Sequence, residues 1–323
     1  GYYNNWDFDK DLIKDYLNAI SLTSINYVEI GFRNIANNNF KGALAFSTDE
    51  YLNSIEIPDN INLGVMINSS QLIDSKEYLK SLKTLFPNDI NNSPLKLVRI
   101  ASNINSIGLS LLAANWLKEK GFKVGINITK ISKIKLSELE ELIKKINKNK
   151  IDVLYVADSL GSINPLDIKN IIGLIKKHCD IPLGIHTHDN LGLALTNTLA
   201  AIENGVDWID STILGMGRGP GNCKTEEILI ELNNSESLHK ISPILETINN
   251  YFIKLKDFYK WGTNPYYYIG GKYGIHPSYI QEIINDKLFS PDDKLALIEK
   301  LKNKNADNYS FKYSPNQIIE YDL

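Results

Sequence analysis

Two histidines separated by a single residue are the sharpest chemical signal in this sequence. His186 and His188 lie in the run Gly184-Ile-His-Thr-His-Asp-Asn-Leu-Gly192, at the end of an apolar stretch. If that stretch is a strand, side chains two positions apart point to the same face, so both imidazoles can reach one cation. This arrangement suits a borderline divalent metal whose other ligands are carboxylate or amide oxygens and water. The alternative is a hydrogen-bonded histidine pair that holds no metal.

A glycine-rich segment is the second chemical signal. Residues 215–222 read Gly-Met-Gly-Arg-Gly-Pro-Gly-Asn. Glycines at alternate positions permit a sharp turn and allow the backbone to approach a ligand closely. The segment therefore indicates a ligand-binding turn, and the alternative is a flexible loop.

These motifs need a scaffold, and the sequence alternates short apolar runs with longer amphipathic stretches. Apolar positions three and four residues apart predict helices in the amphipathic stretches. The apolar runs recur about every 30 residues, which is the length of a βα unit. Such alternation predicts a parallel sheet covered by helices. The seven strand candidates are residues 27–32, 63–67, 97–101, 124–128, 153–157, 183–188 and 208–214.

We predict an α/β fold of the (β/α)8 TIM-barrel type rather than an open, doubly wound sheet. Polar residues recur at the ends of many strands, as they do when a site is built from loops around one rim of a barrel. An open sheet usually carries an early GxGxxG turn, which this sequence lacks. Seven strands do not close an eight-stranded barrel, so we expect a first strand before Gly1. We assign residues 1–240 to a barrel domain lacking strand 1, and residues 241–323 to a small C-terminal helical region.

Polar side chains at the ends of other strand candidates complete the predicted site. The planar fork of Arg99 suits bidentate binding of a carboxylate. Asn127 and Ser159 are further candidates for substrate binding, and Glu29 and Asp158 are candidates for catalysis. Each of them could instead be a structural polar residue inside the mouth of the barrel.

Together, the two motifs resemble the paired signatures of the metal-dependent aldolase and lyase superfamily. That superfamily includes 4-hydroxy-2-oxovalerate aldolase, hydroxymethylglutaryl-CoA lyase and isopropylmalate synthase. The resemblance implies that His186 and His188 are metal ligands and that Asn222 is a further ligand. It also implies that Glu29 contacts the substrate or a metal-bound water. The cation would be Mn²⁺ or Mg²⁺, since oxygen-rich sites accept both.

The sequence departs from that superfamily at its start. Family members have a first strand that ends in Arg-Asp-Gly, whose Asp binds the metal and whose Arg stabilises an enolate. Here Gly1-Tyr-Tyr-Asn-Asn-Trp resembles the sequence just after that segment. The aldolases also use a histidine in this region as the general base, and residues 1–6 contain none. The resemblance therefore leaves the base unidentified.

Two further features resemble parts of the superfamily less closely. Some of its lyases use a loop cysteine, but Cys223 follows the glycine-rich segment and is expected to be a packed cysteine at a helix start. Tyr266, Tyr267 and Tyr268 are placed like an aldolase segment in which a tyrosine reaches the active site. The alternative for these tyrosines is an aromatic packing cluster.

Composition narrows the class of protein. A net charge of -3 and a pI near 6.0 give no general attraction to nucleic acid. No apolar run approaches the roughly 20 residues that a membrane span needs, and the two cysteines lack metal or disulfide spacing. We therefore expect a cytoplasmic protein that acts on a small molecule. Asp49 and Glu50 are expected on a solvated helix face.

The expected function is that of a divalent-metal-dependent aldolase. Such a carbon–carbon lyase acts on a 2-oxo acid through a metal-stabilised enolate. Cleavage releases an aldehyde, and in the aldol direction the enolate attacks one. One alternative is a Claisen condensing enzyme that uses an acyl-CoA. A non-enzymatic alternative is a catalytically degenerate barrel that serves as a binding or scaffold subunit. The resemblance implies that residues 261–279 contact a partner dehydrogenase, and the alternative for this segment is a homodimer interface.

Overall fold

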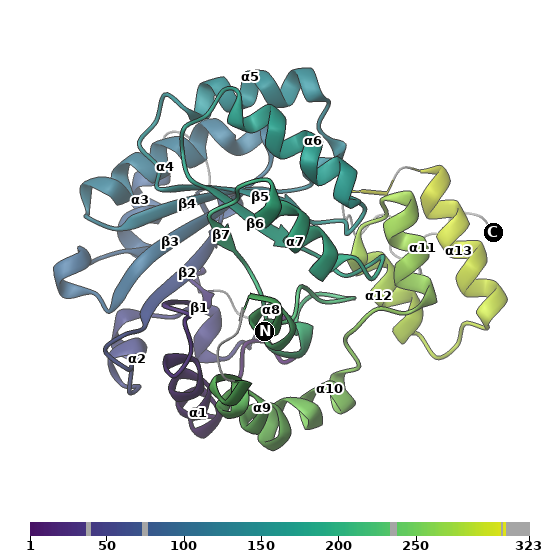
Figure 1. Cartoon of the computed structure of the whole chain (residues 1–323), viewed down its shortest axis with the longest axis horizontal. Coiled ribbons are helices and arrows are strands. Elements are labelled where there is room, and N and C mark those ends of the chain that lie inside the picture. Colours follow the sequence, from purple (N-terminus) through teal and green to yellow (C-terminus); the bar gives the residue numbers. More distant parts are fainter. Residues whose placement is uncertain (37–39, 73–76, 233–237, 305, 308–323) are drawn as a thin grey trace.

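The computed structural model describes residues 1–36, 40–72, 77–232, 238–304 and 306–307. One parallel sheet runs through this part of the chain, with its strands in sequence order (Figure 1). All seven predicted strands are confirmed, although the last one is shorter than expected. The strands are β1 Tyr27–Phe32, β2 Asn62–Asn68, β3 Leu95–Ser102, β4 Lys123–Ile128, β5 Val153–Asp158, β6 Leu183–Thr187 and β7 Trp208–Ile209.

Strand β7 ends early because the chain turns out of the sheet after Ile209. The Asp210 N–H still donates to the Ile185 carbonyl at 3.0 Å. Thr212 then forms an isolated bridge with Lys224, and Leu214 has a left-handed φ of 48° in the 3₁₀ turn Ile213–Gly215. This exit leaves Asp210 at the carboxyl end of the sheet, next to β6.

Helices follow the strands and lie on the outer side of the curled sheet (Figure 1). The predicted apolar stripes form their buried faces, as on α5, where Leu139, Leu142, Ile143 and Ile146 are buried. Local signals fix the helix ends: α6 begins with a capping box in which Asn164 and Asp167 exchange hydrogen bonds with backbone N–H groups. The helices are α1 Lys10–Ser21, α2 Asp49–Asn53, α3 Tyr78–Leu85, α4 Ile107–Glu119, α5 Leu136–Ile146, α6 Pro165–Lys176, α7 Ala194–Glu203 and α8 Thr225–Leu232.

The sheet is curled so that side chains of its two outer strands, β1 and β7, come close to each other. Within the described residues, β1 pairs only with β2 and β7 only with β6. The rings of Tyr27 and Trp208, at the starts of these strands, lie 4.7 Å apart, and the Lys123 ammonium lies 5.3 and 5.6 Å from the two ring centres. The TIM-barrel type of fold is therefore confirmed with seven strands, and a strand before Gly1 stays a prediction.

The C-terminal part is helical, as predicted, but its first helices belong to the barrel core. Ile244, Ile248 and Phe252 pack in that core. They lie on α9 Ser242–Thr247 and on the π-helical turn Ile248–Phe252, which leads into α10 Ile253–Tyr259. The predicted boundary at residue 240 stays a prediction.

The last three helices form a separate cluster at one side of the barrel (Figure 1). They are α11 Pro265–Tyr273, α12 Pro277–Asn285 and α13 Pro291–Asn303. Each begins with proline after a capping residue, namely Asn264, His276 or Ser290, because proline suits the first helical position and the cap satisfies free N–H groups. In the described part of the chain, no helix combines the length and apolarity needed to span a bilayer.

The expectation for Asp49 is wrong. Asp49 is only 8% exposed, and its carboxylate forms an ion pair with the buried Arg33, which lies just after β1. Ser93 and Asn88 also donate to this carboxylate, at 2.9 and 2.8 Å. The helix α2 is too short for a local pattern to reveal its buried face. Glu50 is exposed, as expected.

Candidate active site

His186 and His188 lie together at the carboxyl end of β6, with ring centres 5.2 Å apart. The Nδ1 atom of His186 is 2.9 Å from Oδ2 of Asp210. Because an ionised carboxylate only accepts hydrogen bonds, Nδ1 carries a proton, which leaves Nε2 as the nitrogen that a metal could reach. A histidine whose Nδ1–H is held by a carboxylate in this way has the tautomer of a metal ligand.

His188 is the more enclosed of the two rings. Its Nδ1 is buried and has no hydrogen-bond partner among the described residues. Burial lowers the pKa of His188 well below its ordinary value, and the proximity of His186, Arg218 and His276 acts in the same direction. The ring is therefore neutral at physiological pH, as a metal ligand must be.

Several of the predicted site residues contact Arg99. It is 4% exposed, and its two terminal nitrogens donate to both oxygens of Asp210 at 3.0 and 2.6 Å. Its Nε donates to Oδ1 of Asn127 at 3.2 Å, and Oε2 of Glu29 lies 3.3 Å from Nη1. The guanidinium also lies over the ring of Tyr155 at 3.9 Å. In this structure, the fork of Arg99 holds a carboxylate of the protein itself.

Asp210 is the site residue that the sequence analysis missed. Burial pushes the pKa of its carboxyl up, but Arg99 and His186 outweigh this effect and hold the pKa below its ordinary value. Asp210 thus links Arg99 to His186 as an ionised carboxylate. The signal was present, since Asp210 is the polar residue that follows the apolar start of the last strand candidate.

Asp158 and Ser159 make structural contacts at the end of β5. Asp158 is fully buried and accepts from the backbone N–H groups of Ser162 and Ile163, at 3.0 and 3.2 Å. Burial raises the pKa of Asp158 to about 6 although these N–H groups act against it. Ser159 Oγ accepts from the Lys130 N–H at 3.0 Å. A catalytic role for Asp158 and a substrate-binding role for Ser159 stay predictions.

The glycine-rich segment folds back against the two histidines. Asn222 forms an isolated bridge with His188, and its Nδ2 lies 3.2 Å from Nε2 of His186 and donates to the Thr187 carbonyl at 3.1 Å. A Cβ added to Gly217 would lie only 1.9 Å from Oδ1 of Asn222. Glycine at that position is therefore required for Asn222 to occupy its place.

These residues fit part of a metal site. His186 Nε2 is the nitrogen that a metal could reach, His188 has a buried nitrogen without a described partner, and the Asn222 amide lies beside them. In the described ranges, however, no group of three His, Cys, Asp or Glu side chains could hold a metal ion. The described chain thus offers two imidazoles and one amide, and the carboxylate ligand implied by the resemblance is not among them.

Cys223 and Tyr267 have packing roles in this structure. Cys223 is 1% exposed, and burial raises the pKa of its thiol to about 11. Tyr267 is 1% exposed in the core of α11 to α13, whereas Tyr268 is 52% exposed. None of these observations tests whether a tyrosine reaches a substrate.

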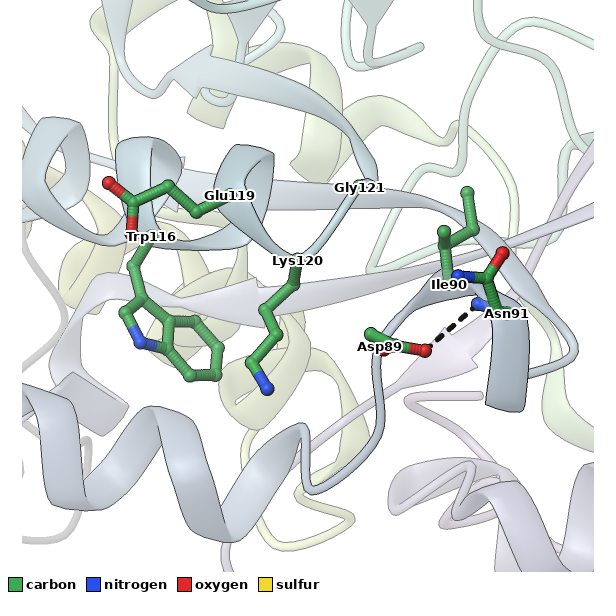
Figure 2. A pocket seen from close by; sticks show the side chains of 7 residues that line it. All are labelled: Asp89, Ile90, Asn91, Trp116, Glu119, Lys120 and Gly121. Carbon is green, nitrogen blue, oxygen red and sulfur yellow. Dashed lines mark hydrogen bonds between the residues drawn. The ribbon is translucent and has the colours of Figure 1, made fainter.

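A surface pocket lies at the opposite end of the sheet. Figure 2 shows its lining side chains, which precede β3 and β4 rather than follow them. Active sites of barrel enzymes lie at the carboxyl ends of the strands, so this pocket is not part of the site. Its lining residues are Asp89, Ile90, Asn91, Trp116, Glu119, Lys120 and Gly121.

A curled parallel sheet with helices on its outer side and polar side chains at its carboxyl end is the arrangement of a TIM-barrel enzyme. The family described as HMGL-like matches residues 86–250, which is half of the chain. The chain belongs to the HMGL-like family.

Similar proteins agree with this assignment. An oxaloacetate decarboxylase of Mycobacterium tuberculosis is 26% identical over 72% of this chain and 66% of its own length. A 4-hydroxy-2-oxovalerate aldolase of Carboxydothermus hydrogenoformans is 32% identical over 47% of each chain. The chain thus spans about half to two thirds of the length of these curated relatives.

Solved structures show the same fold. The N-terminal domain of a candidate aldolase from Bacteroides vulgatus is 30% identical and aligns with a TM-score of 0.74 over 89% of this chain and 94% of that one. The HMG-CoA lyase of Bacillus subtilis is 14% identical and aligns with a TM-score of 0.62 over 79% of this chain and 89% of that one. At that identity, the lyase supports the fold alone.

Proposed function

We propose that this protein is a divalent-metal-dependent carbon–carbon lyase that acts on a 2-oxo acid, similar to the 4-hydroxy-2-oxovalerate aldolases. The observation that carries the proposal is the position of His186, whose Nδ1 lies 2.9 Å from Asp210 and whose Nε2 lies 3.2 Å from Asn222, next to the buried His188. The names of the relatives, an aldolase and a decarboxylase, support this reaction class. A cytoplasmic location and a homodimer or dehydrogenase partner stay predictions.

His186, His188 and Asn222 would hold the cation in this proposal. A bound divalent cation would act as a Lewis acid toward the negative charge that develops on the keto oxygen of the substrate. Asp210 keeps the His186 tautomer, and Arg99 keeps Asp210 ionised and oriented. These charged neighbours are already in place, so little reorganisation is needed during the reaction.

Glu29 is the better placed of the two predicted catalytic carboxylates. Its side chain is 28% exposed and lies beside Arg99, so it can meet a substrate at the mouth of the barrel. Asp158 is fully buried, and both of its oxygens accept from backbone N–H groups. We therefore assign proton transfer to Glu29 and the support of the β5 turn to Asp158.

The test is metal binding by the full-length protein. Isothermal titration with Mn²⁺ should show one site, and His186→Ala and His188→Ala should each weaken it by tenfold or more because each removes one nitrogen ligand. His178→Ala is the matched control, since His178 lies at the outer surface beside Glu140. Stoichiometric binding would then justify assays of 2-oxo acid cleavage. A wild-type protein that binds no Mn²⁺ would contradict the proposal and favour the scaffold alternative.

A further inference from the structure

The turn that follows β7 contains a leucine in a conformation that this residue rarely adopts. In the 3₁₀ turn Ile213–Gly215, Leu214 has φ 48° and ψ 24°, which lies in the left-handed region. A leucine there is strained because its Cβ crowds a backbone carbonyl oxygen, and such residues persist only where the surrounding structure fixes them. Gly215, the next residue, also has a left-handed φ of 68°. Contacts from the rest of the chain must therefore hold this turn.

Two buried side chains bind the backbone of Leu214. The Leu214 N–H donates to Oε2 of Glu226 on α8 at 3.1 Å, and Nε1–H of Trp261 donates to the Leu214 carbonyl at 3.0 Å. Glu226 is 8% exposed and Trp261 is 3% exposed, so water does not readily replace either partner. Both backbone polar groups of the strained residue are thus satisfied by side chains from later parts of the chain.

The same turn fixes the backbone on both sides of Asn222. The Asn222 N–H donates to the Gly215 carbonyl at 3.1 Å, and the Thr212 N–H donates to the Cys223 carbonyl at 2.9 Å. A change in the backbone of the turn would displace both of these partners. It would also displace the Asn222 amide, whose Nδ2 lies 3.2 Å from Nε2 of His186. The position of Asn222 therefore depends on the conformation of the turn.

Trp261 belongs to the segment between α10 and α11, and this segment has anchors of its own. The Gly262 N–H donates to the Gly219 carbonyl at 3.2 Å, and the Thr263 hydroxyl donates to the Asn190 carbonyl at 3.1 Å. Neither of these bonds involves the indole of Trp261. Replacing the indole by a similar ring therefore removes the bond to the turn while the segment keeps its other contacts.

We propose that Glu226 and Trp261 are positioning residues of the candidate metal site. They hold Leu214 in the left-handed conformation that places Asn222 beside His186. The inference rests on the proposed function, in which Asn222 is a ligand of the cation. Glu226 and Trp261 are not ligands themselves and act only through the turn. Trp261 thus gives the segment that leads into the C-terminal helices a role in the site.

Variants that each remove one hydrogen bond test this role by calorimetry with Mn²⁺ on full-length protein. Trp261→Phe keeps an aromatic ring but removes the N–H, and Glu226→Met keeps a side chain of similar length but removes the acceptor. Each should weaken Mn²⁺ binding by about tenfold, as expected when the groups that orient a ligand are lost. Glu226→Gln keeps an oxygen that can accept from the Leu214 N–H, so its affinity should stay close to that of wild type.

Two matched controls use the same substitutions at other places. Trp116→Phe changes a tryptophan of the surface pocket at the opposite end of the sheet, and Glu231→Met changes an exposed glutamate on α8. Both should bind Mn²⁺ as tightly as wild type. Thermal unfolding of each variant reports whether it folds.

A glycine at position 214 separates positioning from packing. Glycine adopts the left-handed conformation without strain, so Leu214→Gly should bind Mn²⁺ like wild type. In this background the loss of affinity caused by Trp261→Phe should shrink from about tenfold to about twofold or less, because the turn no longer depends on the indole. If Trp261 acted through packing alone, its replacement would weaken binding by the same factor in both backgrounds. The same comparison with Glu226→Met serves if Trp261→Phe does not fold.

The outcomes separate the two proposals. Suppose that wild-type protein binds Mn²⁺ and that Trp261→Phe and Glu226→Met bind it equally well, or that the loss is the same in both backgrounds. The positioning role is then wrong while the proposed lyase function stands. The same conclusion follows if Leu214→Gly alone loses Mn²⁺ binding, because the leucine side chain would then set the turn. If wild-type protein binds no Mn²⁺, the proposed function is wrong and the positioning role is wrong with it.

Discussion

At the scale of single residues, the candidate site depends on a few close contacts around Asn222. Local spacing was enough to single out the histidine pair, and the resemblance of the glycine-rich segment to the superfamily indicated Asn222, because both motifs lie within short stretches of sequence; their roles as ligands stay predictions. Asp210 was missed because its importance depends on Arg99, which is 111 residues away in sequence. Only the order of the strands and the curl of the sheet bring their side chains together, and no local pattern contains that information.

Gly217 permits a direct test of the position of Asn222. In Gly217→Ala, the new Cβ would lie 1.9 Å from Oδ1 of Asn222, so the amide must turn away. We expect Mn²⁺ affinity to fall by about ten- to a hundredfold, as it does when groups around a metal are displaced. Calorimetry on folded protein measures this change.

Gly173→Ala is the control for that experiment. Gly173 lies in α6, and a Cβ at this position would meet nothing within 4 Å. Alanine also favours the helix relative to glycine, so Mn²⁺ affinity should stay unchanged and stability should not fall. If Gly217→Ala binds Mn²⁺ as tightly as the control does, Asn222 is not a ligand.

At the scale of elements, the buried ion pair of Arg33 and Asp49 ties β1 to α2 and α3. Arg33 also donates to the carbonyls of Ser47 and Leu85, so its guanidinium is satisfied on several sides. The sequence pattern predicted a solvated face for Asp49, because a five-residue helix shows no reliable period. The contact depends on the position of the C-terminal end of α3, which is set by tertiary packing and not by a local sequence pattern.

Loss of Asp49 should therefore be costly. Asp49→Ala leaves the Arg33 charge buried without its carboxylate, and breaking a buried pair in this way costs about 3–5 kcal/mol in the free energy of unfolding. Urea denaturation measures the change. Glu56→Ala is the control, because the Lys14–Glu56 pair is exposed and its loss should barely move the midpoint. A shift for Asp49→Ala as small as that of the control would show that the buried pair contributes little.

At the scale of the whole molecule, the period of apolar runs predicted the parallel sheet and its helices, since each βα unit has its own local pattern. The same reasoning could not predict how the C-terminal helices sit on the barrel. Their contacts depend on surfaces that form only after folding: Gly219 lies against Tyr267 and Pro277, and Thr263 donates to the Asn190 carbonyl at 3.1 Å.

His276 lies at this junction and makes it sensitive to pH. Burial, with the charges of Arg218 and Lys130, lowers its pKa from 6.5 to about 3 in the folded protein. The unfolded chain therefore binds the proton more readily below pH 6.5, and stability falls as the pH drops from 6.5 toward 3. At pH 5 this linkage costs about 2 kcal/mol.

His276→Asn should remove that loss, because asparagine can still cap α12 but does not titrate. Urea denaturation at pH 7 and pH 5 measures the loss of unfolding free energy between these pH values. This loss should be smaller in the variant than in wild type by about 2 kcal/mol. His186 and His188 are present in both proteins, so their own contributions cancel in the comparison. His178→Asn, on the outer surface, should keep the wild-type dependence on pH. An equal loss of stability in His276→Asn and wild type would mean that His276 is not held neutral at the junction between α12 and the barrel.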